Sequence, residues 1–414
     1  MQLEKYSIGI GDRFGHEGPA QMQAFIAARE RGIAITPVWN KSNREHTIVG
    51  TEPMDVRREA DRAVRTVGWT GPYRVDADHI GVKTVDRFIP ASDFFTLDVA
   101  DYIGTSASEE ELDSFQRSMA GFLGDLAIPG IEQSFAVTDE TIREIAKKYL
   151  AAAKEAGAIY RRIASEKGED NFIVEVSMDE TDSSQTPLEL FFILAALAQE
   201  KIPLQTVAPK FVGEFHKGVD YIGDVRAFER EFEEDLLVLK HASQVFSLPH
   251  SLKLSVHSGS DKFSLYPVIR RLMAKHDAGI HLKTAGTTWL EELIGLAAAG
   301  GDGLAIAREI YREAYERIDE LCKPYATVVR IDKASLPLPE VVSAWGSEEF
   351  VGALKHNQKN PAYSVHVRQM LHVAFRIAAE MGTRYTHALE RYEKIVGANV
   401  AENILDRHIA PLFF

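Results

Sequence analysis

The chain has 414 residues, of which 45% are hydrophobic and 26% are charged, and this composition predicts a globular protein with a large core. Its formal net charge of −14 argues against a nucleic-acid partner, because neutralising phosphates requires a basic face. The single cysteine, Cys322, excludes a disulfide framework and a cluster of thiolate metal ligands. The first residues do not resemble a signal peptide, and no uninterrupted apolar stretch of about 18 residues occurs, so we expect a cytoplasmic protein without a membrane span.

Short apolar segments alternate with helical segments through the first 290 residues. The expected strands are residues 6–10, 33–38, 73–77, 94–97, 172–176, 204–208, 252–257 and 279–282. The expected helices include residues 19–31, 53–67 and 188–198, the last opened by a capping box at Thr186 and Glu189. Eight strands alternating with helices predict an α/β fold, a closed (β/α)8 TIM-like barrel with parallel strands. An open doubly wound sheet is the main alternative, but no Gly-x-Gly-x-x-Gly follows the first strand.

Two segments interrupt or follow this alternation. An acidic helical insertion after strand four covers about residues 100–168 and ends in one long helix from 138 to 166. Residues 291–414 are expected to form a mainly helical extension packed on the barrel of residues 1–290. In this extension we expect an extra strand at 326–331 and a helix that begins at Asn360-Pro361.

The seventh expected strand shows how the barrel interior is organised. Its apolar residues alternate with Lys253, Ser255 and His257, which would point inward while the apolar set packs against outer helices. The strand then ends in the polar turn His-Ser-Gly-Ser-Asp-Lys. In barrel enzymes the carboxyl ends of the strands carry the chemistry, so this turn marks a candidate site. An ordinary edge strand with a solvated turn is the alternative for this segment alone.

Charged, amide and imidazole side chains recur at or near the carboxyl ends of the expected strands. They are Asp12, Arg13, Asn40, Lys41, Asp76, Asp78, His79, Asp98, Glu175, Lys210, His257, His281 and Lys283. Burying a charge costs several kcal/mol unless the group is paired, hydrogen-bonded or bound to a metal. This pattern therefore predicts a functional site at one end of the barrel, with buried ion pairs of no catalytic role as the alternative.

Imidazoles and carboxylates that converge in a barrel mouth suit a divalent metal such as zinc, manganese, nickel or cobalt. We expect Glu175, His257 and His281 to share one ion, because strands five, seven and eight lie near one another around a barrel. Asp78 or His79 would complete the ligand set.

The turn at residues 258–262 offers backbone N–H groups, hydroxyls and an ammonium group, a combination that suits a carboxylate or phosphate. Within it, Asp261 is also a plausible helix N-cap. The loop after strand six carries Lys210, Glu214 and His216, and it is either solvated or folded over the barrel mouth.

Several long motifs resemble the tagaturonate epimerase family of bacterial hexuronate breakdown. They are residues 76–80, 83–88, 209–224, 256–263 and 281–286, so the resemblance covers most of residues 70–290 and, more loosely, the C-terminal helices. The resemblance implies interconversion of D-tagaturonate and D-fructuronate, a small-molecule hexuronate substrate and a divalent metal. The sequence leaves a homo-oligomer open.

The implied reaction constrains the mechanism, because the two ketouronates differ at the carbon beta to the ketone, whose proton is not acidic enough for simple enolisation. Retro-aldol cleavage, rotation of the aldehyde and aldol closure solve this problem, with an enediolate that the metal stabilises as a Lewis acid. Two proton-transfer groups are then needed.

Roles for individual residues follow from strand position and the motif matches. Asp78 and Glu214 are the expected proton-transfer groups, and Lys210 and Lys283 are expected near the developing charges. The substrate-binding residues are expected to be Ser260, Lys262, Arg368 and His216. Two other functions remain: a metal-dependent ketose isomerase or aldolase on a related sugar, and a non-enzymatic sugar-acid-binding protein.

Overall fold

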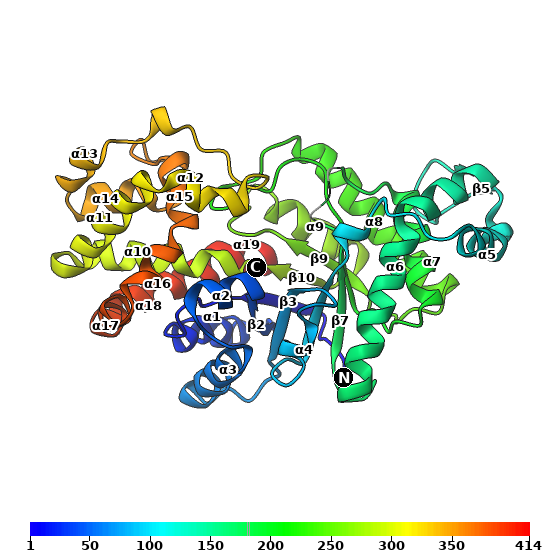
Figure 1. Cartoon of the computed structure of the whole chain (residues 1–414), viewed down its shortest axis with the longest axis horizontal. Coiled ribbons are helices and arrows are strands. Elements are labelled where there is room, and N and C mark those ends of the chain that lie inside the picture. Colours follow the sequence, from blue (N-terminus) through cyan, green and yellow to red (C-terminus); the bar gives the residue numbers. More distant parts are fainter. Residues whose placement is uncertain (180, 182) are drawn as a thin grey trace.

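Eight parallel strands close into a barrel in the computed structural model, which describes residues 1–179, 181 and 183–414 (Figure 1). The strands, in chain order, are β1 (Tyr6–Ile10), β2 (Thr36–Ser42), β3 (Arg74–Ile80), β4 (Phe94–Asp98), β7 (Ile173–Ser177), β8 (Thr206–Ala208), β9 (Lys253–His257) and β10 (Ile280–Lys283). Each strand pairs with its neighbour in sequence, and β10 closes the ring against β1 with Gly9 opposite Lys283. The prediction of a (β/α)8 barrel is confirmed.

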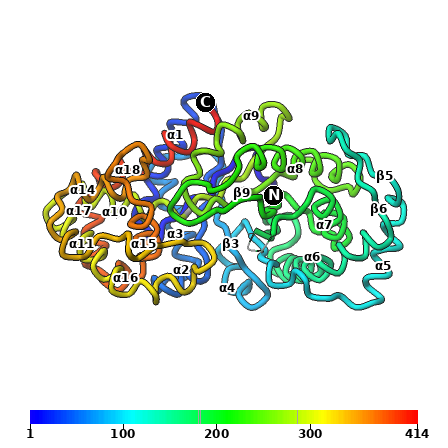
Figure 2. Tube along the Cα trace, turned by 90° about the horizontal axis from the view of Figure 1, so that it is seen from above, coloured from blue at the N-terminus to red at the C-terminus, as the bar shows by residue number. Residues whose placement is uncertain are grey.

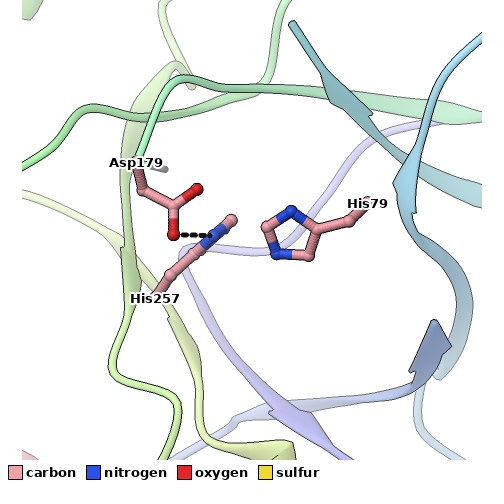
Figure 3. A group of neighbouring side chains, drawn as sticks. All are labelled: His79, Asp179 and His257. Atoms are coloured by element: carbon pink, nitrogen blue, oxygen red, sulfur yellow. Dashed lines mark ion pairs between the residues drawn. The ribbon is translucent and has the colours of Figure 1, made fainter. Parts of the chain in front are cut away.

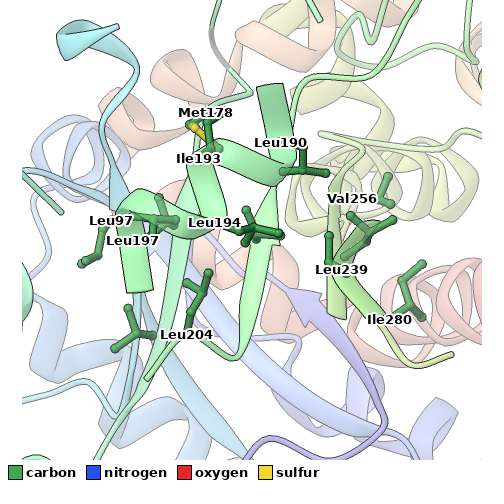
Figure 4. Close-up of a cluster of buried hydrophobic side chains, with 14 of the residues drawn as sticks. Leu97, Met178, Leu190, Ile193, Leu194, Leu197, Leu204, Leu239, Val256 and Ile280 are labelled. Carbon is green, nitrogen blue, oxygen red and sulfur yellow. The ribbon is translucent and has the colours of Figure 1, made fainter. Parts of the chain in front are cut away.

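Helices cover the outside of the barrel between the strands. They are α1 (Gly18–Glu30), α2 (Asn43–Val49), α3 (Pro53–Val67), α4 (Val85–Phe88), α6 (Asp139–Lys167), α7 (Pro187–Gln199), α8 (Val225–Val245) and α9 (Tyr266–His276). The capping box expected at the start of α7 is present, since Thr186 and Glu189 each accept the other's backbone N–H. Apolar side chains of α7 such as Leu194 pack over the neighbouring strands (Figure 4), and each fully buried leucine contributes about 1.5–3 kcal/mol.

The insertion after β4 projects from one side of the barrel. It contains η1 (Ala100–Tyr102), α5 (Glu109–Met119), η2 (Ala120–Phe122) and a hairpin of β5 (Gly124–Leu126) and β6 (Phe135–Val137), and the long helix α6 follows. The sequence predicted the long helix but missed the hairpin, because its strands are only three residues long and only Leu126 and Val137 are buried.

The helical extension lies on the opposite side of the barrel from the insertion (Figures 1 and 2). Its elements are α10 (Thr288–Ala299), α11 (Gly301–Glu316), α12 (Ile318–Cys322), η4 (Lys323–Tyr325), η5 (Lys333–Ser335), α13 (Pro339–Ser343), α14 (Ser347–Leu354), α15 (Val365–Val373), α16 (Phe375–Met381), α17 (Thr383–Arg391), α18 (Glu393–Glu402), η6 (Asn403–Ile409) and α19 (Ala410–Phe413). Trp289, Tyr311 and Tyr385 anchor a second hydrophobic core there. The last elements return to the barrel, where α18 packs on α1 and α19 packs on α9.

Two local predictions in the extension are wrong. Residues 326–331 do not form a strand, because the N–H groups of Val328 and Val329 turn back to the carbonyl of Tyr325. The helix expected at Asn360 begins at Val365, where Ser364 is the N-cap. The Asn360 side chain instead accepts the N–H of Ala362 in a local turn, a common competitor of helix initiation.

The interior of the barrel is unusually polar for a packed core. One small apolar cluster at its floor consists of Leu3, Val38, Phe94 and Ile173. Other inward positions include Ser7, Asp76, Thr96, Glu175, Thr206, Lys253, Ser255, His281 and Lys283, all buried. Barrel interiors are usually filled by branched apolar residues, so this polarity needs a chemical explanation.

A search of the described part of the chain finds no helix with the length and hydrophobicity needed to cross a membrane.

Candidate active site

The carboxyl end of β3 has an irregular backbone that turns two neighbouring side chains toward the barrel mouth. The register between β3 and β4 shifts between Ala77 and Ile80, and His79 has a left-handed backbone with φ of 50°. Such a conformation is rare for residues other than glycine and costs on the order of 1–3 kcal/mol. Asp78 and His79 consequently both join the same group of side chains, although strict alternation would have separated them.

Lys283, the last residue of β10, lies among three buried carboxylates. Its Nζ is 2.9 Å from Asp76 Oδ2, 3.0 Å from Asp78 Oδ1 and 3.2 Å from Glu175 Oε1. The ammonium also donates a hydrogen bond to the hydroxyl of Thr96, which itself contacts Asp76 and Glu175. These groups come from β3, β4, β7 and β10, so the closed barrel is what brings them together.

The excess of carboxylates controls the protonation of this group. Burial would lower the pKa of Lys283, but the three carboxylates raise it well above its usual value. Burial would raise the pKa of Asp78, but Lys283 and His79 lower it to about 2. For Asp76 burial prevails over the attraction of Lys283 and raises the pKa to about 7. The site therefore holds a permanent cation, a permanent anion and a carboxyl group that titrates near neutral pH.

Beside this lysine, His79, Asp179 and His257 form a compact set of potential metal ligands (Figure 3). One ligand atom of each lies within 4.8 Å of the others. His257 Nδ1 is 3.1 Å from Asp179 Oδ2, and His79 Nδ1 is 3.4 Å from Asp98 Oδ2. We use the name mouth cluster for Asp76, Asp78, His79, Glu175, Asp179, His257 and Lys283.

The three residues of this set fit a divalent metal. The Nδ1 atoms of His79 and His257 are buried and form no hydrogen bond of acceptable geometry. Two imidazoles and a carboxylate are the donors that zinc, manganese, cobalt and nickel accept. The Nε2 of His257 is 2.7 Å from Glu175 Oε1, an arrangement in which a carboxylate orients a metal-binding imidazole. Burial opposes a charge on either imidazole, yet the nearby carboxylates raise the pKa of both, for His79 to about 10, so this position attracts a cation.

The predicted metal ligands are brought together in part. Glu175 and His257 are in contact, and His79 lies 5.0 Å from His257 between ring centroids. His281 lies deeper in the barrel, where its Nδ1 is 2.9 Å from Ser7 Oγ and where burial lowers its pKa to about 3. It is not in the set of three.

Sequence reasoning did not include Asp179. The inward positions of β7 are residues 173, 175 and 177, so extending this alternation by two residues past the strand would have identified Asp179.

The predicted catalytic residues fall into two groups. Asp78 and Lys283 are 3.0 Å apart in the mouth cluster. Glu214 and Lys210 lie on the loop between β8 and α8, where Glu214 Oε2 is 3.2 Å from His216 Nε2 and the Lys210 N–H donates to Gln185. Within the described part of the chain, no hydrogen bond or ion pair joins Glu214 or Lys210 to the mouth cluster, so their catalytic roles stay predictions.

The residues predicted to bind substrate are largely occupied by the protein itself. Lys262 Nζ donates to the carbonyls of His216 and Val219 at 3.1 and 2.8 Å, and to Ser260 Oγ. Arg368 donates to the carbonyls of Gly218 and Leu354 and lies 2.9 Å from Asp261 Oδ2. These contacts bind the loop after β8, the turn after β9 and helix α15 to one another.

Asp261 is the centre of this second group of buried charges. The prediction that it caps a helix is wrong, because α9 begins at Tyr266 and Leu265 is its N-cap. The carboxylate is instead surrounded by Arg368, by His356 at 3.0 Å and by His408 at 3.4 Å. Burial would raise the pKa of Asp261, but these cationic and hydrogen-bonding partners lower it well below its usual value. We call Asp261, His356, Arg368 and His408 the Asp261 cluster.

Comparison with known proteins gives one consistent result. A family model described as tagaturonate epimerase matches residues 1–409. The chain is 28% identical to a tagaturonate/fructuronate epimerase of Thermotoga maritima over 420 residues, which cover 97% of this chain and 80% of that protein. It is 25% identical to the fructuronate-tagaturonate epimerase of Cohnella laeviribosi, whose crystal structure with one glycerol superposes with a TM-score of 0.81 over 100% of this chain and 82% of that chain. The native crystal structure of the same Cohnella enzyme gives a TM-score of 0.79 with the same coverage.

Proposed function

Because this chain belongs to the tagaturonate epimerase family, we propose that it interconverts D-tagaturonate and D-fructuronate. The observation that carries the proposal is the mouth cluster, where a lysine, several carboxylates and two imidazoles meet at the carboxyl ends of the barrel strands. A core designed only for stability would not retain so many buried charges. The family match and the chemistry of the site thus point to the same reaction class, a carbohydrate epimerisation.

The reaction needs a bond cleavage at a carbon that is not acidic. The two sugars differ at the carbon beta to the ketone, and we propose that this centre inverts by retro-aldol cleavage. A base takes the proton of the hydroxyl on the beta carbon, the bond between the alpha and beta carbons breaks, and its electron pair forms an enediolate. The beta carbon becomes an aldehyde, which rotates, and the reverse steps close the bond on its other face.

Two residues of the mouth cluster suit the proton and charge movements of this scheme. Asp78 is ionised at neutral pH and can accept a hydrogen bond from a substrate hydroxyl, while Asp76, whose pKa is raised to about 7, is the stronger base of the pair. Lys283 remains an ammonium and can stabilise negative charge that develops on substrate oxygens. Asp76 contacts the same ammonium at 2.9 Å and titrates near neutral pH, so it can adjust the net charge of the site.

A divalent metal is assigned in this proposal to His79, Asp179 and His257, whose donor atoms fit it. When bound there, it would supply a Lewis acid that withdraws electron density from a carbonyl or alkoxide oxygen. Glu175 would hold His257 in the orientation that binding requires.

The activity is tested with the purified protein and D-tagaturonate, before and after EDTA treatment and after each of zinc, manganese, nickel and cobalt is added back. We expect NMR to identify D-fructuronate as the product, turnover to fall by at least about 100-fold with EDTA, and at least one metal to restore it. Absence of D-fructuronate under every metal would contradict the function. Full turnover by protein that elemental analysis finds metal-free would contradict the metal assignment alone.

The mechanism is tested separately by running the reaction in deuterated water. The C–H bond at the inverted carbon stays intact in the retro-aldol route, so we expect the product to carry no deuterium there. Deuterium at that carbon would rule out this route, and free three-carbon fragments as the main products would indicate an aldolase instead.

A further inference from the structure

Two residues outside the mouth cluster and the Asp261 cluster have unusual surroundings: Arg13, in the loop after β1, and His372, on α15. Both are buried, with exposed fractions of 7% and 2%. Each has polar side-chain atoms without a hydrogen-bond partner, namely Nε and Nη1 of Arg13 and Nε2 of His372. Leaving buried donors unpaired is costly, and native proteins rarely do so without a ligand, water or ion to complete them.

Arg13 is fixed in position without using up its donors. Its Nη2 is 2.8 Å from Glu45 Oε1, its guanidinium lies 4.4 Å from the ring centre of Phe375, and its carbonyl accepts a 2.6 Å hydrogen bond from Lys41. The first contact is with the barrel side and the second with the helical extension. Arg13 therefore lies where these two parts of the molecule meet, with two side-chain nitrogens, Nε and Nη1, left without a partner.

His372 lies against the loop after β10, and Arg13 lies in the loop after β1, the strand that pairs with β10. A Cβ placed on Gly286, three residues after Lys283, would be 2.8 Å from His372 Nε2. On the other side, a Cβ placed on Gly9 would be 2.9 Å from Lys283 Cγ and 3.2 Å from Asn40 Nδ2. Arg13 follows this Gly9 by four residues, and Lys41, which holds its carbonyl, follows Asn40.

The electrostatics of this region favour an anion. Burial lowers the pKa of His372, and Arg13 is the next largest cause of that shift, followed by Lys217 and Arg368. Cationic side chains thus surround a neutral imidazole, which in one tautomer offers an N–H at Nε2. The mouth cluster has the opposite character, with more carboxylates than cations around Lys283. A substrate with a carboxylate at one end and a ketone at the other matches this polarity.

We propose that Arg13 and His372 bind the carboxylate of the hexuronate and thereby make the enzyme prefer a sugar acid over the corresponding neutral sugar. This inference rests on the proposed function, since it places the acid end of that substrate. It differs from the expectation for Lys262 and Arg368, because each side-chain nitrogen of these two residues already donates a hydrogen bond within the protein. Both residues act in binding and orientation, and neither takes part in the proton transfers.

The test compares D-galactonate with galactitol as inhibitors, because this pair differs only in a terminal carboxylate. With wild-type enzyme we expect galactonate to inhibit D-tagaturonate turnover more strongly than galactitol. In Arg13→Gln the preference for galactonate should fall by about 10- to 100-fold, as for the loss of hydrogen bonds to a charged group. The KM for D-tagaturonate should rise by a similar factor with kcat within about threefold, because uniform binding has been removed. His372→Gln should show the same pattern at about 3- to 10-fold.

Arg44→Gln is the matched control, because Arg44 is an exposed arginine next to Glu45 that packs on Tyr325 at 4.6 Å, and it should change neither preference nor KM. Equal inhibition by both compounds in the wild type, or an unchanged preference in Arg13→Gln, would overturn the proposal. A fall in kcat with the preference intact would also overturn it, because that result assigns Arg13 a structural role. All of these outcomes are measured with enzyme that turns over D-tagaturonate, whereas a wild type inert toward D-tagaturonate would instead reject the proposed function.

Discussion

The mouth cluster and the Asp261 cluster are built from similar side chains in opposite proportions. In the mouth cluster one ammonium, that of Lys283, is shared by three carboxylates. In the Asp261 cluster one carboxylate is shared by a guanidinium and two imidazoles. The mouth cluster leaves carboxylate and imidazole ligand atoms for a further cation. In the Asp261 cluster, Arg368 donates hydrogen bonds to backbone carbonyls. We therefore propose that buried charge serves chemistry in the mouth cluster and assembly in the Asp261 cluster.

Their positions in the fold agree with this division. The mouth cluster is made by residues inside barrel strands (Asp76 and Glu175), residues at or near the carboxyl ends of strands, and Asp179 just after β7. The Asp261 cluster joins the turn after β9 to α15, to the loop after α14 and to η6, so it fixes the helical extension on the barrel. Substitutions in the first should thus change turnover, and substitutions in the second should change stability.

Lys283→Met should give the largest effect on the mouth side. Removing the ammonium takes away a cation that opposes the negative charge developing on the substrate oxygens, and we expect kcat to fall by about 1000-fold. Circular dichroism establishes the folded fraction, so that turnover is counted per folded molecule.

Lys253→Met is the matched control for this variant. Lys253 is also a buried lysine inside the barrel, but at the opposite end, where it binds the carbonyls of Leu3, Glu4 and Lys5. We expect it to lower the free energy of unfolding and to leave kcat nearly unchanged. Equal losses of kcat in Lys283→Met and Lys253→Met would contradict a catalytic role that is specific to the carboxyl end of the barrel.

Arg368→Met should give the largest effect on the assembly side. It leaves Asp261 buried without its main cationic partner, and we expect the free energy of unfolding to drop by about 3–4 kcal/mol. Urea unfolding measures this loss, and kcat/KM per folded molecule should stay within about threefold. Arg391→Met, which breaks an exposed pair with Asp302, is the control and should cost less than about 1 kcal/mol. A collapse of kcat/KM in folded Arg368→Met would restore the substrate-binding role predicted from sequence.

Glu175→Gln should have a smaller effect, which is on metal affinity. The substitution keeps the shape of the side chain but weakens its contact with His257 Nε2, so metal affinity should fall by about 10- to 100-fold. Calorimetric titration of metal-free protein with zinc or manganese measures it. Glu291→Gln, at a buried carboxylate 3.9 Å from Arg368, is the control and should leave metal affinity unchanged. Similar metal affinities in the wild type, Glu175→Gln and Glu291→Gln would show that Glu175 does not support metal binding.

The two clusters should also respond to pH with opposite signs. The pKa of Asp261 is lowered in the folded state, so its contribution to stability is present above its unfolded pKa of about 4 and is lost as the pH falls below it. The pKa of Asp76 is raised to about 7, so the folded state binds its proton more tightly and stability is lost as the pH rises from about 4 to 7. Relative to wild type, Asp76→Asn should gain stability over that range. The stability that Asp261→Asn loses relative to wild type should be smallest at acid pH. Parallel pH profiles of both variants in urea unfolding would contradict these signs.

The fold could be predicted from the sequence because its signal is local. Alternating apolar residues and the capping box at Thr186 and Glu189 mark strands and helices without knowledge of distant partners. The elements without such signals were missed or misplaced. The hairpin of β5 and β6 has one buried side chain per strand. Helix α15 begins at Val365 because Ser364 caps it, whereas Asn360 forms a local turn.

The site was predictable to the extent that strand ends define it. Asp78, His79, Glu175, His257 and Lys283 follow from that rule. Contacts with residues far along the chain do not follow from it, so the sequence did not show that Lys262 and Arg368 also bind groups of the protein itself. The partner of Arg368 is 107 residues away, and the carbonyl acceptors of Lys262 are more than 40 residues away. Asp179 shows the intermediate case, since the alternation of β7 contains it but the strand ends before it.

The return of the chain to the barrel has a consequence for biosynthesis. Phe413 packs on Tyr6 with ring centres 5.0 Å apart, and α18 packs on α1, so residues translated after the barrel strands cover surfaces of the first strand and the first helix. A nascent chain that has left the ribosome only as far as β10 still exposes those surfaces. The protein must therefore complete folding after translation has passed this point, and the growing polypeptide carries an apolar face that a chaperone can bind in the meantime.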